Sequence, residues 1–379
     1  MDRLARPRFF YFDFWLLAAT LLLTIIGILM IYSATECITG EPLDWNSPTV
    51  RQGMYAFAGL VALFLLSLVD YRLYGSLRWV LWVGILGLLA IVFVIGQVTH
   101  GAQRWIDLRF FLFQPSELSK LVLILVVAKY IADHEAEMQR WRHVIVSFGL
   151  VAIPMLLVYL QPDLGTTIII GATWGVLILA TGIRLRDALL LLALVVVLAP
   201  LLWVNLRPYQ QERILTFLDP GRDPLGSGYN VTQARIAIGT GGLWGAGFCS
   251  GPQSQLRFLR IRQTDFIFAV IGEELGFGGT LFVIALYVFI LFRLVRVAML
   301  ARDTYGKLIA IGIVAVLFIQ SFVNLGMTMG LMPVVGIPLP FVSAGGSSLI
   351  TLYAAQGIAQ SVLLRHRELR LEGAGQRYE

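Results

Sequence analysis

Charged side chains are scarce in this chain of 379 residues: 14% are Asp, Glu, Lys or Arg, whereas 58% are hydrophobic. Soluble domains usually carry about 25% charged residues. This scarcity excludes a large soluble domain and predicts an all-α polytopic membrane protein, a single integral membrane domain over residues 1–379. The net charge of +6 does not indicate a nucleic-acid partner, because no basic, aromatic-rich patch lies on a soluble module.

Cysteine and histidine are also rare. Cys37 and Cys249 form no CxxC motif and no Cys/His cluster, which argues against a zinc or redox site. The sequence does not decide between two free thiols and a disulfide, which is possible because the topology predicted below places both cysteines on the outer side. No HExxH or GxSxG motif occurs, and the Gly-rich run 239–251 matches neither common phosphate-binding fingerprint. The four scattered histidines argue against a histidine-based catalytic centre.

Long hydrophobic runs are what the sequence has instead. A membrane-spanning helix needs about 20 mostly apolar residues. Ten runs approach or exceed this length, and we predict about ten transmembrane helices over residues 14–33, 53–69, 77–95, 116–131, 144–159, 165–181, 188–204, 265–292, 308–330 and 343–364. The long segment 205–264 separates the seventh helix from the eighth and is expected to form short helices on the outer surface.

The distribution of Lys and Arg predicts the orientation, since cytoplasmic loops are enriched in both. With a cytoplasmic N-terminus, the inner segments carry 17 of them, whereas the short outer loops carry only Arg51, Arg104 and Arg109. We therefore predict a multi-pass protein of the bacterial cytoplasmic (inner) membrane with both termini in the cytoplasm. The segment 205–264 is then extracytoplasmic.

With this orientation, the unusual polar residues gather at or just below the outer surface. They are Arg104, Glu117, Lys120, Asp163, Arg213, Asp265, Asn324, Ser343 and Ser347. Ionisable residues within membrane segments usually mark functional sites. A transporter is expected to place its site near the midplane, whereas this pattern predicts a cavity that opens outward. No nucleotide-sugar pool exists outside, so an enzyme there needs a substrate that carries its own activation, such as a lipid-linked pyrophosphate.

Three of these residues have alternative structural interpretations. Glu117 and Lys120 are three residues apart and share a helix face, so they form a structural ion pair, a phosphate-orienting pair, or both. Asp265 is either a helix N-cap or a functional carboxylate. Glu273 and Glu274 lie too deep in the helix to form a carboxylate pair with Asp265, and we expect them to bind a neighbouring helix or a water.

Motifs spread over most of the chain carry a family resemblance. They are GAQRWI at 101–106, QPSE at 114–117 with Lys120, QPDLGT at 161–166, ERI at 212–214 with LDP at 218–220, DPLGSGY at 223–229, TDFIF at 264–268 with EELG at 273–276, GIPLPFVS at 336–343 and GGSS at 345–348. In this order they resemble the SEDS family, the shape, elongation, division and sporulation proteins of bacteria. The run 327–340 is more similar to elongation members than to division members. Gln263 and Ala344 depart from the histidine and tyrosine that the family often has there.

The resemblance implies a ten-helix peptidoglycan glycosyltransferase that polymerises lipid II on the outer face of the membrane, with undecaprenyl pyrophosphate as leaving group. It implies that the aspartate at Asp265 is essential, and we interpret Asp265 as the general base. It also implies a class B penicillin-binding protein, a transpeptidase, as partner, together with other membrane proteins of the elongation complex.

We expect the remaining polar residues to bind substrate, with Arg104, Lys120 and Arg213 on the pyrophosphate. A divalent cation such as Mg²⁺ or Mn²⁺ is an expected cofactor, with Asp163 or Asp265 as candidate ligands; the sequence shows no dedicated metal site. The alternatives are a lipid II flippase, a division-type polymerase, and a scaffold that only activates the transpeptidase.

Overall fold

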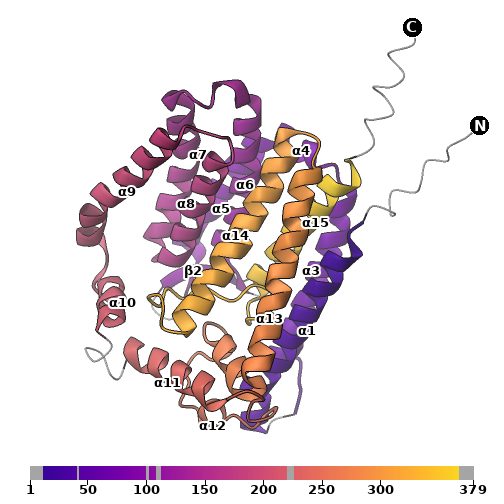
Figure 1. Cartoon of the computed structure of the whole chain (residues 1–379), viewed down its shortest axis with the longest axis vertical. Coiled ribbons are helices and arrows are strands. Elements are labelled where there is room, and N and C mark those ends of the chain that lie inside the picture. Colours follow the sequence, from indigo (N-terminus) through magenta and orange to yellow (C-terminus); the bar gives the residue numbers. More distant parts are fainter. Residues whose placement is uncertain (1–11, 41, 100–101, 108–111, 220–225, 367–379) are drawn as a thin grey trace, which may run out of the picture.

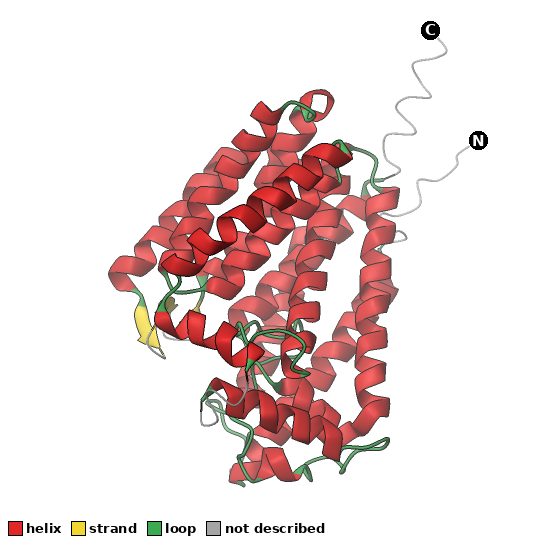
Figure 2. Cartoon of the chain, turned by 60° about the vertical axis from the view of Figure 1, so that its left-hand side comes forward, coloured by secondary structure: helices red, strands yellow, loops and turns green. Residues whose placement is uncertain are grey.

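A bundle of long helices forms most of the computed structural model, which describes residues 12–40, 42–99, 102–107, 112–219 and 226–366 (Figures 1 and 2). Each predicted apolar run coincides with one of its long helices. These are α1 (Phe14–Ala34), α3 (Pro48–Leu68), α5 (Arg78–Ile95), α6 (Pro115–Asp133), α7 (Trp141–Leu160), α8 (Leu164–Leu179), α9 (Leu185–Asn205), α13 (Ile267–Leu300), α14 (Thr304–Thr328) and α15 (Gly346–Leu364). Within the described residues, seven helices are long and apolar enough to cross a membrane, and α8 is a shorter apolar helix. The predicted polytopic helical fold is confirmed.

The centre of the bundle is built around α15, which is buried along almost its whole length and packs closely against α3. The close approach requires small residues, as is common between membrane helices. A β-carbon on Gly357 would lie 2.5 Å from the main-chain oxygen of Leu63 in α3. The helices α6 and α14 complete the core, whereas α5 and α9 expose mostly apolar side chains to the surroundings.

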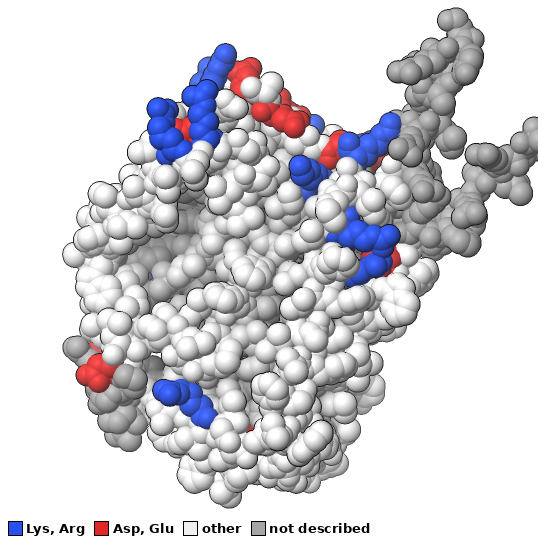
Figure 3. Space-filling model, in the orientation of Figure 1, with Lys and Arg blue, Asp and Glu red and all other residues white. Residues whose placement is uncertain are grey.

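One end of the bundle holds the start of α1 and the end of α15 (Figure 1). Asp13 accepts a hydrogen bond from Leu16 and caps α1, and its carboxylate forms an ion pair with Arg293 of α13 at 2.6 Å. Gln360 of α15 exchanges two hydrogen bonds with the main chain of Asp13. Figure 3 shows Lys and Arg side chains gathered in the upper half of this view, toward the same end. The short helices α4 (Tyr71–Ser76) and η2 (Glu135–Glu137) also lie there.

The opposite end carries the remaining short elements (Figure 1). An antiparallel sheet in the order β1-β2-β3 lies between α5 and α6, and was not predicted; it comprises β1 (Gln97–Thr99), β2 (Ala102–Asp107) and β3 (Leu112–Phe113). The segment 205–264 forms short helices, as predicted: α10 (Pro208–Leu218), α11 (Ser227–Thr240) and α12 (Pro252–Gln255). The helix α2 (Glu36–Thr39) follows α1 at this end.

A kink in α13 receives the Gly-rich run 239–251. Gly276 has φ +65°, which breaks the helical ladder, and the freed groups bind the loop instead. The amide of Phe277 donates to Gly242, and the amide of Ala246 donates to the oxygen of Glu273, both at 2.9 Å. The loop is thereby built into the helix by main-chain hydrogen bonds.

The same region contains a disulfide, which answers the question that the sequence left open about the two cysteines. Cys37 and Cys249 form a disulfide with a Cα–Cα distance of 5.9 Å, so they are not free thiols. Glu274 brings the two segments together, because its carboxylate accepts from the Ser33 hydroxyl at the end of α1 and from the amide of Cys249. Glu273 accepts from two amides at the start of α12, so both carboxylates bind neighbouring segments, as expected.

Candidate functional site

Asp265 lies in the turn that precedes α13. The helix begins at Ile267, and its N-cap residue is Phe266, with no side-chain capping bond. The interpretation of Asp265 as a helix cap is therefore wrong, because the chain enters the helix two residues later. Its carboxylate is left for another role, and the residue is partly exposed.

The main chain on both sides of Asp265 is held by the segment that leads into α15 and by α14. Three successive carbonyl oxygens accept one hydrogen bond each. The pairs are Gln263 with the amide of Ala344 at 2.9 Å, Thr264 with the Ser343 hydroxyl at 2.6 Å, and Asp265 with the Asn324 side-chain amide at 3.0 Å. Asn324 also donates to Ile337 at 2.7 Å. Ser343 and Asn324 thus position the carboxylate, and their predicted contacts with substrate stay predictions.

Gly336 lies beside both Asp265 and Arg213, an arginine on α10. It has φ +72°, and a β-carbon there would lie 3.5 Å from Asp265 Oδ2 and 3.7 Å from Arg213 Nη1. The guanidinium of Arg213 also lies 5.8 Å from the centre of the Tyr209 ring. Since the left-handed backbone favours glycine, this position carries no side chain. The carboxylate and the guanidinium both border the space that a β-carbon would occupy, which is called the Gly336 gap below.

The surroundings of Asp265 favour its neutral form. Removal from water raises the pKa of Asp265 to about 6, against the opposing effects of the Arg213 charge, the Thr264 hydroxyl and the more distant Arg104 charge. A carboxyl whose pKa approaches the working pH is suited to accept a proton during a reaction. The effect of Arg104 also shows that a second group of predicted residues lies within electrostatic reach.

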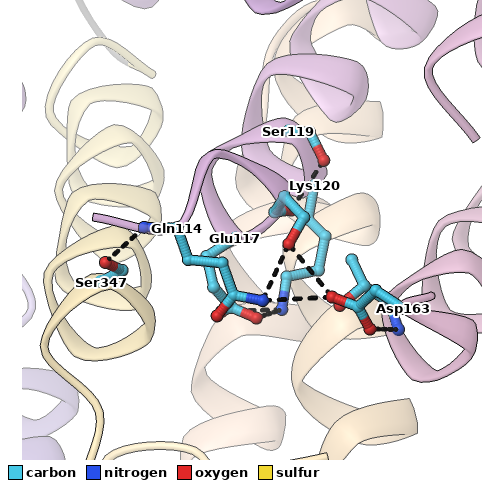
Figure 4. A network of polar contacts seen from close by, with 8 residues as sticks. Gln114, Glu117, Ser119, Lys120, Asp163 and Ser347 are labelled. Atoms are coloured by element: carbon cyan, nitrogen blue, oxygen red, sulfur yellow. Dashed lines mark hydrogen bonds and ion pairs between the residues drawn. The ribbon is translucent and has the colours of Figure 1, made fainter. Parts of the chain in front are cut away.

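That second group is centred on the start of α6 (Figure 4). Lys120 Nζ lies 2.9 Å from both carboxylate oxygens of Glu117, and both side chains are buried. The predicted ion pair is confirmed, and a contact with phosphate stays a prediction. Lys120 lines two small cavities on either side of α6, one toward α8 and one toward α14 and α15.

Asp163 joins α6 to the turn before α8. Its carboxylate accepts from the amide of Thr166, capping α8 at 3.1 Å, and from Gln114 and Ser116 at 3.1 and 3.2 Å. Arg104 of β2 binds the same turn, since its Nε donates to the Gln161 oxygen at 3.0 Å and its Nη2 donates to Pro162. Both oxygens of Asp163 are therefore already engaged.

Ser347 connects α15 to the end of the sheet through hydrogen bonds. Its hydroxyl donates to Leu112 at 3.0 Å and accepts from the amide of Gln114 at 2.9 Å (Figure 4). The residues around Asp265 and those around the start of α6 are connected through the segment 343–347. Gln52 of α3 holds this segment, since it donates to the Ser343 oxygen and accepts from the amide of Gly345. Gln52 and Gly336 were missed by the sequence analysis. Neither had a clear local signal, because Gln52 follows Arg51 just before the apolar run 53–69 and nothing local separated Gly336 from the other glycines.

The described residues contain no group of three or more His, Cys, Asp or Glu side chains that would hold a metal ion. A cation at this site would therefore depend on oxygens supplied by a substrate, which is the usual arrangement for Mg²⁺ with phosphates.

Comparison with known proteins identifies the family. A family model described as cell cycle protein, which covers FtsW, RodA and SpoVE, matches residues 14–368. The chain belongs to this family. The resemblance seen in the sequence is thus confirmed.

Three relatives give the extent of the similarity. The chain is 40% identical over 342 residues to the peptidoglycan glycosyltransferase MrdB of Escherichia coli strain K12, covering 90% of this chain and 92% of that one. A chain from a peptidoglycan synthase complex that coordinates polymerization and crosslinking superposes with a TM-score of 0.78 at 32% identity, covering 94% and 99%. The rod shape determining protein RodA of Thermus thermophilus gives 0.69 at 28% identity, covering 96% and 99%.

Proposed function

We propose that this chain is a peptidoglycan glycosyltransferase of the elongation type, which polymerises lipid II with Asp265 as general base. The observation that carries the proposal is the open gap at Gly336, with a carboxylate of pKa about 6 on one side and the Arg213 guanidinium on the other. The family membership and the similarity to MrdB support the reaction class.

The reaction follows from this arrangement. A sugar hydroxyl of the acceptor attacks the anomeric carbon of the lipid-linked donor, the new glycosidic bond forms, and the bond to pyrophosphate breaks. Asp265 takes the proton of the attacking hydroxyl, and the bonding electrons leave with undecaprenyl pyrophosphate. Arg213 stabilises the negative charge on the leaving group through charge-assisted hydrogen bonds.

A divalent cation such as Mg²⁺ or Mn²⁺ would share this site. Asp265 is its best-placed protein ligand, because both oxygens of Asp163 accept hydrogen bonds. The cation would add positive charge at the pyrophosphate. Titration of Mg²⁺ and Mn²⁺ after EDTA treatment tests this: polymerisation that is unchanged by EDTA would overturn it.

We propose that the end carrying Asp265 faces the outside of the cytoplasmic membrane. On the face shown in Figure 3, most Lys and Arg side chains lie toward the other end, which supports this orientation. The disulfide between Cys37 and Cys249 gives a second argument, because such bonds persist in oxidising compartments and are rare in the cytosol.

A class B penicillin-binding protein is the proposed partner. The support is the similarity to a chain of a complex that couples polymerization to crosslinking. Because the chain also resembles division-type relatives, depletion in cells separates the two types: round cells support the elongation type, and filaments would support the division type.

The decisive experiment is polymerisation of purified lipid II by this chain together with its transpeptidase-inactive partner, comparing wild type with Asp265→Asn and Asp265→Ala. We expect long glycan strands from wild type and none from either variant, while folding and partner binding persist. Normal polymerisation by the variants would overturn the general-base role. A wild-type protein that only moves lipid II between leaflets would be a flippase, and one that only activates the transpeptidase would be a scaffold.

A further inference from the structure

A pocket apart from the Gly336 gap borders Arg213. It lies between α10, α11 and the residues that follow α14, and Asp265 and Gly336 are not among its lining residues. Arg213 therefore lines this pocket as well as the gap at Gly336. The pocket is not explained by the positioning of the Asp265 carboxylate.

The lining of this pocket is positively charged. Among the residues that the structure describes, it includes Arg213 and Arg235 and no carboxylate. Across the part of the chain that the structure describes, neither arginine forms an ion pair. Two unneutralised guanidinium groups around one space favour an anion, and Arg matches phosphate oxygens particularly well.

A buried hydroxyl in the same lining has no partner. Thr216 is 5% exposed, and its Oγ1 makes no hydrogen bond to any described residue. It lies three residues after Arg213 on α10, and residues at this spacing share a helix face. An unsatisfied buried hydroxyl costs free energy, and a bound anion would satisfy it.

Gly330 shapes the mouth of the pocket. It has φ +74°, and a β-carbon there would lie 3.0 Å from Cδ of Arg235 and 3.3 Å from Cγ1 of Val231. The missing side chain lets the stem of Arg235 lie against the chain turn that ends α14. Arg235 is exposed, whereas Arg213 is partly buried, so the first stands at the mouth and the second further inside.

We propose that this pocket is a phosphate-binding subsite that takes one phosphate group of a lipid-linked pyrophosphate. The pocket measures about 30 Å³, about twice the space that one buried water needs, so phosphate oxygens enter while sugar and lipid chain stay outside. The source of the phosphate rests on the proposed function. Because Arg213 also borders the gap beside Asp265, one guanidinium links the pyrophosphate position to the general base.

The test is a binding titration with undecaprenyl pyrophosphate on the full chain in phosphatidylcholine nanodiscs. Arg235→Gln is expected to weaken binding about tenfold, which is about 1.4 kcal/mol, and Thr216→Val about threefold. Arg257→Gln is the matched control, an exposed arginine of the same outer segment that does not line the pocket, and it should bind as wild type. Equal affinities for wild type and Arg235→Gln, in proteins of equal thermal stability, would overturn the subsite.

Further ligands identify the source of the phosphate. Undecaprenol, which has no phosphate, should bind equally to wild type and Arg235→Gln, and inorganic pyrophosphate should compete for the Arg235-dependent part of the binding. Nanodiscs that contain phosphatidylglycerol should not weaken binding by wild type. If they do so in wild type and not in Arg235→Gln, the pocket takes membrane headgroups and its assignment to lipid-linked pyrophosphate is wrong.

Different results would refute the phosphate subsite and the proposed function. Arg235→Gln should raise KM for lipid II more than it lowers kcat, whereas Asp265→Asn should bind undecaprenyl pyrophosphate and not polymerise. A wild-type protein that does not polymerise but binds through Arg235 would refute the function and keep the subsite. Polymerisation that depends on Asp265, with binding independent of Arg235, would do the reverse.

Discussion

Two aspartates with arginine neighbours stand at opposite ends of the bundle, and they are built differently. Asp13 caps α1 and forms a buried ion pair with Arg293 at 2.6 Å. Asp265 caps no helix, and the Gly336 gap lies between it and Arg213. Asp and Arg thus form a direct ion pair at one end, whereas at the other end Asp265 and Arg213 border the Gly336 gap. This indicates that, of the two pairs, only the second is shaped to receive a ligand.

The largest expected effect separates the two aspartates directly. Asp265→Asn should lower polymerisation about 10²- to 10⁴-fold, the usual contribution of a general base, without loss of thermal stability. Asp13→Asn should leave Arg293 without its counter-charge and destabilise the protein by about 3 kcal/mol. Activity assays and thermal unfolding in detergent measure both. An Asp265→Asn protein that unfolds early would show that this carboxylate is structural after all.

The gap itself is tested by filling it. Gly336→Ala places a methyl group between Asp265 and Arg213, and we expect polymerisation to fall at least about tenfold, since small displacements at a reacting centre have large effects. Gly182→Ala is the matched control, because Gly182 has φ +73° and open space around it. Both variants carry the same backbone strain. Equal activities in the two would mean that the gap at Gly336 has no function.

The pH dependence of kcat/KM tests whether Asp265 reacts in its ionised form and interacts with Arg213. If Asp265 must be ionised, kcat/KM should fall about tenfold per pH unit below pH 6, because its pKa is raised to about 6. The charge of Arg213 lowers this pKa, so Arg213→Gln should move the midpoint to higher pH. The midpoint is read from pH–rate profiles of both proteins, and identical midpoints would argue against an interaction between the two side chains.

The same pKa predicts a stability effect of opposite sign to that of a salt bridge. Since the folded state raises the pKa above its ordinary value of 3.8, ionisation of Asp265 costs stability. Stability should fall as the pH rises from about 4 to 6 and then level off. This dependence should be absent from Asp265→Asn, which thermal unfolding at several pH values can check.

Local patterns in the sequence were sufficient for the long helices. The apolar runs predicted each of them, and the run 116–131 predicted α6 in spite of Glu117 and Lys120, with the helix starting one residue earlier, at Pro115. The ion pair on α6 follows from spacing alone. These features depend on residues that are close along the chain.

Features that depend on long-range packing were not accessible in this way. Asp265 and Arg213 lie far apart along the chain and meet only at Gly336, and the disulfide joins cysteines 212 residues apart. The helix-cap interpretation of Asp265 failed because Asn324 and Ser343 bind the preceding turn and delay the start of α13. The kink at Gly276 likewise depends on a loop that occupies it.

The smallest expected effect concerns the covalent link at the outer end. Replacing Cys37 and Cys249 together by Ser should lower the stability of this end by about 2 kcal/mol, a contribution with no counterpart at the Asp13 end. Polymerisation should stay within about twofold of wild type, because the main-chain hydrogen bonds between the Gly-rich loop and α13 remain. Thermal unfolding and lipid II polymerisation measure the two effects.

The single variant Cys37→Ser leaves the thiol of Cys249 for labelling. A membrane-impermeant maleimide added to intact spheroplasts should modify it, because the Asp265 end is proposed to face outward. A label that reaches this thiol only after the membrane is permeabilised would invert the bundle. Asp265 would then face the cytoplasm and the Asp13–Arg293 ion pair the outside. The substrate could no longer be one presented on the outer surface.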